Sequence, residues 1–264
     1  MISPPGALAD IGHAVLRWFK GWWQIVHLGA QLLVLALSPS IYTRANRAAM
    51  ARHIVVGTAP MLLWFTLLSS LISLVVIRIV VVTAASYGLS QYALQMVVRV
   101  LVLELIPLTA AVFVALRIGL PDGRELARMR SRGELDALRG RGLDPLAHEV
   151  LPRVIACAFA VLMLAAVAGV VTLVLAYFTV HGFTIGGLER YTRTVGQVFT
   201  PAVTLIFTAK TLLLALAVSL IPVASALYDL PRSRTRSSAE LQALVRLFLV
   251  MLLIEAASLV GNYY

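Results

Sequence analysis

The order of apolar and polar positions divides the chain into five long hydrophobic stretches joined by shorter polar segments. A helix needs about 20 mostly apolar residues to cross the hydrocarbon core of a bilayer. The stretches therefore predict an all-α integral membrane protein with spans near residues 54–82, 92–116, 154–178, 202–227 and 244–259. No polar segment is long enough to fold as a soluble domain, so residues 1–264 are interpreted as one domain.

The segment before the first span, at about residues 10–37, differs from the five stretches. Its apolar part, 25–37, covers only about two-thirds of a bilayer crossing. It follows the sequence Arg-Trp-Phe-Lys-Gly-Trp-Trp at residues 17–23, in which cations are interleaved with aromatic rings. This mixture is typical of a helix that lies in the membrane interface. We predict an interfacial elbow helix here, and a sixth transmembrane helix is the alternative.

Composition agrees with a membrane protein, because 60% of the residues are hydrophobic, only 13% are charged and the mean hydropathy is +0.92. The net charge of +10 comes from short loops: residues 117–153 contain eight arginines, whereas 83–91 contain none and 179–200 contain two. A further three, Arg232, Arg234 and Arg236, lie in 229–240. Cytoplasmic loops carry an excess of Lys and Arg. The distribution predicts a cytoplasmic N-terminus and a periplasmic C-terminus, and it explains the basic charge without a nucleic-acid partner.

Signatures of catalysis and of cofactor binding are missing from the sequence. There is no Gly-x-x-x-x-Gly-Lys-Ser/Thr loop for a nucleotide phosphate. His148-Glu149 is followed by Pro152 where a zinc protease has its second histidine. The single cysteine, Cys157, cannot form an internal disulfide or share a metal with another cysteine. We therefore expect no catalytic residue, no metal and no cofactor on this chain.

Several ionisable residues fall inside predicted spans, where an unpaired charge costs at least about 2.5–3.5 kcal/mol. Glu104 lies near the middle of the second span, close to Pro107, and for it we favour a functional role. For Lys210 in the fourth span and Glu255 in the fifth we favour a structural role. The alternatives for Glu104 are a structural pair with Arg99 or Lys210, or a protonated side chain hydrogen-bonded within the bundle.

The loop at 117–153 is capable of forming a helix over about residues 123–141, where charges of both signs alternate. We expect this helix to end at residues 140–142 and Asp144-Pro145 to turn the chain back to the membrane. An amphipathic helix that protrudes from a membrane is either a solvated connection or a helix that fills a groove on a partner.

The stretch from 104 to 153 contains a series of short motifs: Glu104-Leu105-x-Pro107, Arg117-x-Gly119, Met129-Arg130, Glu134-Leu135-Asp136-Ala137-Leu138 and Asp144-Pro145. With these motifs the stretch resembles the MlaE family of ABC-transporter permeases. Ile106 and Leu116 stand where the family has glycines. More loosely, the resemblance extends to the whole chain as a single MlaE-type permease domain.

The resemblance implies a permease that pairs with a second copy in the bacterial inner membrane and carries phospholipid. Two cytoplasmic ATPase subunits would bind ATP and Mg, and a periplasmic MCE-domain protein would receive or deliver the lipid. The residues implied at the lipid cavity are Glu104, Tyr87, Leu105 and Pro107. The residues implied at the ATPase coupling helix are Met129, Arg130, Glu134, Asp136, Leu138, Asp144 and Pro145.

Two other functions remain open. A membrane scaffold that anchors lipid-binding proteins without transport would make Glu104 dispensable. A membrane-embedded lipid-modifying enzyme would require polar side chains clustered at one interface. The candidates for such a cluster are Tyr191, His181 and Glu189 on the outer loop, and they have no recognisable spacing.

Overall fold

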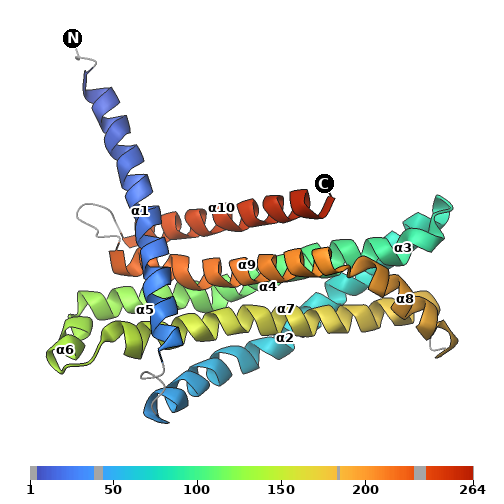
Figure 1. Cartoon of the computed structure of the whole chain (residues 1–264), viewed down its shortest axis with the longest axis horizontal. Helices are drawn as coiled ribbons and strands as arrows, with labels where there is room; N and C mark the ends of the chain where they lie inside the picture. The colour runs from blue at the N-terminus through green and yellow to red at the C-terminus, as the bar shows by residue number, and fades with distance from the viewer. Residues whose placement is uncertain (1–4, 39–43, 183–184, 229–235, 264) are drawn as a thin grey trace.

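The computed structural model describes residues 5–38, 44–182, 185–228 and 236–263 (Figure 1). All regular secondary structure in these ranges is helical. Arg232 and Arg234, which contributed to the predicted orientation, lie outside the described residues. Within the described ranges, five helical segments are long and apolar enough to cross a membrane: Met50–Ser86, Ser90–Ser131, Leu146–His181, Pro201–Tyr228 and Leu241–Asn262. The five predicted spans are confirmed, and each helical segment continues beyond its apolar stretch.

The N-terminal helix α1 (Pro5–Leu37) runs across the bundle rather than along it (Figure 1). It packs on α9 (Pro201–Tyr228) with one face, on which Ile25, Leu28 and Leu32 are buried. Its other faces expose large apolar side chains, including Trp23. Because the five long helices define the direction of the membrane crossing, a helix laid across them agrees with the predicted interfacial elbow. It is also not among the segments apolar enough to span.

Helices α7 (Leu151–His181) and α9 form the centre of the bundle. Both are about half buried, whereas α2 (Arg44–Ser86) and α10 (Arg236–Tyr263) bury a much smaller part of their apolar segments. The contacts follow the same order, since α7 packs against α2, α4 (Ile106–Val114) and α9, and α9 packs against α10. The flanking helices therefore present the apolar faces that lipid or another subunit would cover.

Polar contacts inside this bundle are sparse and specific. Ser73 on α2 and Thr172 on α7 are buried, and their hydroxyl oxygens lie 2.9 Å apart. Cys157 is also buried.

Ala165 and Gly169, two small residues four apart on α7, are buried within the subunit as well, and Gly169 faces Val102. Their spacing therefore serves close packing inside one chain and does not supply an exposed face for a second copy.

The second span is the least regular helix. It consists of α3 (Ser90–Val97), the π-helical stretch η2 (Val98–Leu105), α4 (Ile106–Val114), a second π-helical stretch η3 (Ala115–Gly119) and α5 (Leu120–Ser131). Pro107 at the start of α4 has no N–H to donate to the preceding turn, so the hydrogen-bond pattern changes there.

The C-terminal part of this span, in η3 and α5, lies very close to α9. A Cβ built on Gly119 would lie 2.8 Å from the carbonyl oxygen of Val218, and one on Gly123 would lie 2.9 Å from that of Pro222. Only residues without a side chain allow this approach of two helices. The close approach of the second span to α9 therefore explains why position 119 of the Arg117-x-Gly119 motif is a glycine.

The prediction of a single loop helix over 123–141 is wrong. The structure has two helices, α5 and the short α6 (Glu134–Gly140), separated at Gly133. Gly133 has φ +72°, a left-handed conformation that glycine adopts without steric cost. The predicted end near residue 140 is confirmed. The turn at Asp144-Pro145 is confirmed too, because Asp144 Oδ1 accepts a hydrogen bond from the N–H of Leu146 at 3.0 Å.

Candidate functional site

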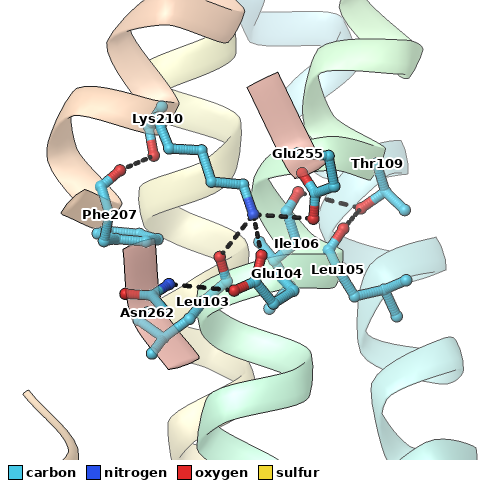
Figure 2. Close-up of polar contacts among 10 residues, drawn as sticks. Leu103, Glu104, Leu105, Ile106, Thr109, Phe207, Lys210, Glu255 and Asn262 are labelled. Atoms are coloured by element: carbon cyan, nitrogen blue, oxygen red, sulfur yellow. Dashed lines mark hydrogen bonds and ion pairs between the residues drawn. The ribbon is translucent and has the colours of Figure 1, made fainter. Parts of the chain in front are cut away.

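A buried cluster of charged and amide side chains joins three of the spans (Figure 2). Lys210 of α9 is only 2% exposed. Its Nζ donates to Oε1 of Glu255 on α10 at 2.8 Å and to the carbonyl oxygen of Leu103 at 3.2 Å, and it also contacts Oε2 of Glu104. Asn262 Nδ2 on α10 donates to the other Glu104 oxygen, Oε1, at 3.2 Å. We call these four side chains, Glu104, Lys210, Glu255 and Asn262, the ion cluster.

Local backbone geometry brings Glu104 to this position. Glu104 lies at the end of the π-helical stretch η2, three residues before Pro107. Where the proline interrupts the ladder, the hydroxyl of Thr109 donates to the carbonyl oxygens of Leu105 at 2.8 Å and Ile106 at 3.0 Å. Short π-helical segments inside α-helices often coincide with functional sites, because they reorient side chains. Here the segment directs the carboxylate toward α9.

The ion cluster has one carboxylate more than it has ammonium groups, and the Glu104 and Glu255 side chains are each 14% exposed. Two buried acceptor atoms, Glu255 Oε2 and Asn262 Oδ1, have no hydrogen-bond partner among the residues that the structure describes. Buried charges are stable only when paired and hydrogen-bonded. The cluster is therefore well suited to accept an additional donor or cation if the helices part.

The structure thus contains the Glu104–Lys210 pair that we considered as an alternative for Glu104. The other residues implied at the lipid cavity lie at different depths. Leu105 is partly buried and Pro107 is buried beside the cluster, whereas Tyr87 is exposed in the turn between α2 and α3. Their role in lipid binding stays a prediction.

The residues implied at the coupling helix separate into an exposed group and a packed group. The side chains of Asp136 and Glu134 on α6 are exposed to solvent, 79% and 45%, and they pair with the neighbouring Arg139 and Arg132 at 3.3 and 3.5 Å. Leu138 is partly buried. The tip of the loop therefore offers carboxylates and apolar surface together.

Met129 and Arg130 on α5 face the bundle instead. Arg130 Nη1 donates to the carbonyl oxygen of Ala226 on α9 at 3.4 Å. Met129 Sδ lies 3.6 Å from Nη2 of Arg153 on α7. These two side chains attach α5 to α7 and α9. Because α6 follows α5 directly in the chain, these contacts also help to position α6.

The polar groups on the segment between the third and fourth spans have structural roles. Tyr191 on α8 (Leu188–Val198) donates its hydroxyl to the carbonyl oxygen of Leu173 at 2.7 Å, and its ring lies edge-on to His181. Burial raises the pKa of Tyr191 to about 12. Glu189 is exposed and pairs with Arg193 at 3.7 Å. The hydroxyl of Tyr191 is used to attach α8 to α7, which gives no support to a catalytic cluster here.

Sequence reasoning missed one member of the ion cluster, Asn262. The structural role predicted for Glu255 stays a prediction. The signal for Asn262 was present in its spacing from Glu255, because residues seven apart share one face of a helix. An amide at that spacing from an intramembrane carboxylate is a candidate partner.

Five apolar helices that enclose a lysine and two glutamates define a multi-pass membrane protein, and buried charges of this kind are typical of membrane transporters. The family model for the permease MlaE matches residues 50–260, which is most of the chain. The chain therefore belongs to the MlaE permease family, the membrane subunits of ABC transporters. A search of curated proteins gave no significant match.

Proposed function

We propose that this chain is the permease subunit of an ABC transporter that moves phospholipid between the inner membrane and a periplasmic MCE-type carrier. ATP is hydrolysed by separate cytoplasmic subunits. The observation that supports this function best is the ion cluster, because it places a lysine and two glutamates within the membrane in a chain of a permease family.

In this proposal the ion cluster meets the lipid headgroup. Lys210 suits a phosphate, and the carboxylates suit an ammonium group. Both carboxylates keep some exposure, so they lie at the edge of the cluster rather than at its centre. A small separation of α10 from α9 is enough to open a polar surface to a lipid that enters between the helices.

The α6 tip is proposed to bind the ATPase. It projects between the second and third spans at the end of the bundle where the arginines gather, which the positive-inside rule assigns to the cytoplasm. Exposed Asp136 and partly buried Leu138 provide one charged and one apolar anchor.

Co-purification tests this docking role. Asp136→Lys with Leu138→Glu is expected to release the ATPase, because it reverses one anchor's charge and places a charge on the other. The matched control makes the equivalent changes on α8, Glu189→Lys with Leu188→Glu, where both side chains are exposed. Equal ATPase recovery from the two variants would rule out the docking role of α6.

Lipid transfer between reconstituted vesicles and the carrier tests the ion cluster. Glu104→Ala is expected to lower the transfer rate by at least about tenfold, since a charged contact of about 1.5–3 kcal/mol is lost. Ser73→Ala, which removes a buried contact elsewhere in the bundle, is the control for general destabilisation. Transfer at the wild-type rate by an assembled Glu104→Ala complex would rule out a role of the Glu104 carboxylate in lipid transfer.

Pairing with a second copy is also proposed. One chain supplies five spans, and the small residues Ala165 and Gly169 are already used inside the subunit, so the exposed faces of α2 and α10 are the available surfaces. Native mass spectrometry in lipid discs is expected to give a dimer. A monomer in the presence of the ATPase and the carrier would contradict the pairing.

A further inference from the structure

A pocket of about 660 Å³ lies at the α5–α6 end of the bundle, between the first turns of α2, the region where η3 meets α5, and the beginning of α7. Its walls are partly apolar, formed by Val56, Ile118 and Ala156. Its polar lining consists of Arg52, His53, Asp122 and Arg153. It is distant from the ion cluster, because Asp122 is 18 residues beyond Glu104, roughly 27 Å along the same helical segment.

The charges of the lining are unequally compensated. Arg153 donates from Nη2 to Glu149 at 3.1 Å and lies close enough to Asp122 to act on its charge. Glu149 and Asp122 therefore both interact with Arg153, and His53 also lies close enough to Asp122 to act on its charge. Arg153 is still not fully satisfied, since its buried Nε has no hydrogen-bond partner within the described ranges.

Arg52 and His53 differ from Arg153 in their exposure and in their lack of an ion pair with the described residues. Both are exposed on α2, and no ion pair is formed by either of them with the part of the chain that the structure describes. They add N–H donors at the mouth of the pocket. The pocket thus has the Arg52 guanidinium and the His53 ring at its mouth, a partly satisfied arginine on another wall and apolar side chains beside both.

The depth of the pocket limits the class of ligand. Its polar residues occur where three spans reach their polar ends, within the arginine-rich half that we predict to be cytoplasmic. This is the level of lipid headgroups. Basic pockets between transmembrane helices on the cytoplasmic side are suited to phosphate-containing headgroups.

We propose that this pocket binds the phosphate of a glycerophospholipid from the cytoplasmic leaflet. Arg52 and His53 donate to the phosphate oxygens at the mouth of the pocket. The first segment of the acyl chains lies against Val56 and Ile118. The proposal concerns a site separate from the ion cluster and does not depend on the transport function.

Binding can be measured by native mass spectrometry on the delipidated full-length chain in detergent. The probes are dioleoyl phosphatidylglycerol and dioleoylglycerol, which share acyl chains but differ in the phosphate. We expect one phosphatidylglycerol to bind about tenfold more tightly than dioleoylglycerol. Arg52→Gln with His53→Gln should remove that difference.

The control variant is Arg128→Gln with His148→Gln, which changes the same two residue types at exposed positions outside the pocket. It should keep the tenfold preference. The unfolding temperature of both variants shows that they remain folded. Asp122→Asn removes the carboxylate from the lining and should bind phosphatidylglycerol at least as tightly as the wild type.

Three results would overturn the proposal. The first is equal affinity for the two probes in the wild-type chain. The second is an equal loss of preference in the control variant, which would indicate general attraction to a basic surface. The third is complete displacement of phosphatidylglycerol by millimolar inorganic phosphate, which would identify free phosphate rather than lipid as the ligand.

Discussion

Lys210 is expected to be the most stability-critical side chain of the ion cluster. Lys210→Met keeps the length of the side chain but leaves Glu104 and Glu255 facing each other without their shared cation. Removing one partner of a buried ion pair typically costs about 3–5 kcal/mol, because the remaining charge is left uncompensated. The three contacts from Nζ are lost together, so we expect a loss of unfolding free energy within that range.

Reversible unfolding in mixed micelles with increasing dodecyl sulfate measures this loss. The matched variant is the triple change Lys210→Met, Glu104→Gln and Glu255→Gln, which removes the carboxylates as well. If uncompensated charge is the cause, the triple variant should recover most of the stability lost in Lys210→Met. A Lys210→Met chain within about 1 kcal/mol of the wild type, or a triple variant no more stable than the single one, would refute the reasoning.

Two further predictions use the same unfolding measurement. Gly119→Ala should lower the free energy of unfolding by about 1–3 kcal/mol, because its Cβ would lie 2.8 Å from the Val218 carbonyl oxygen. The control is Gly140→Ala, whose Cβ would meet no described atom within 4 Å and should leave the free energy of unfolding unchanged. Equal stabilities of the two variants would contradict the close packing of the second span on α9. Tyr191→Phe should cost about 1 kcal/mol through the lost hydrogen bond to Leu173. The pKa of Tyr191 is raised to about 12 by burial, from about 10 when unfolded, so its stabilisation is complete below about pH 10 and is lost as the pH rises toward 12. The Phe variant should lack this alkaline loss, and an identical alkaline loss in both proteins would count against it.

The five spans were predictable because the length of an apolar stretch follows directly from the thickness of the bilayer. The residues at which the helices begin and end were not predictable in the same way. The second span continues as helix to Ser131, well past its apolar part, because polar and charged side chains at a helix end remain in water while the backbone bonds continue. The break at Gly133 was missed because alternating charge is compatible with one helix or two, and only the backbone angle of a glycine separates these cases.

The position of Glu104 in a site was predictable from the cost of an intramembrane charge, but its partner was not. Arg99 is near Glu104 in sequence and Lys210 is more than a hundred residues away, and sequence separation carries no information on which helix lies adjacent. The structure selects Lys210 because α9 packs against α4. Asn262 was missed because an uncharged amide near a helix end costs little to insert and gives no comparable signal.

The ion cluster also has a consequence for how the chain enters the membrane during synthesis. Glu104 is the first of its three charges to be made, and each charge alone disfavours partition of its helix into lipid by about 2.5–3.5 kcal/mol. Lys210 and Glu255 lie on the last two spans, which follow each other closely in the chain and can insert as a hairpin with their charges already paired. The second span must therefore wait beside the insertion machinery, or persist at a cost, until this hairpin arrives. The bundle is completed only when its C-terminal helix is in place.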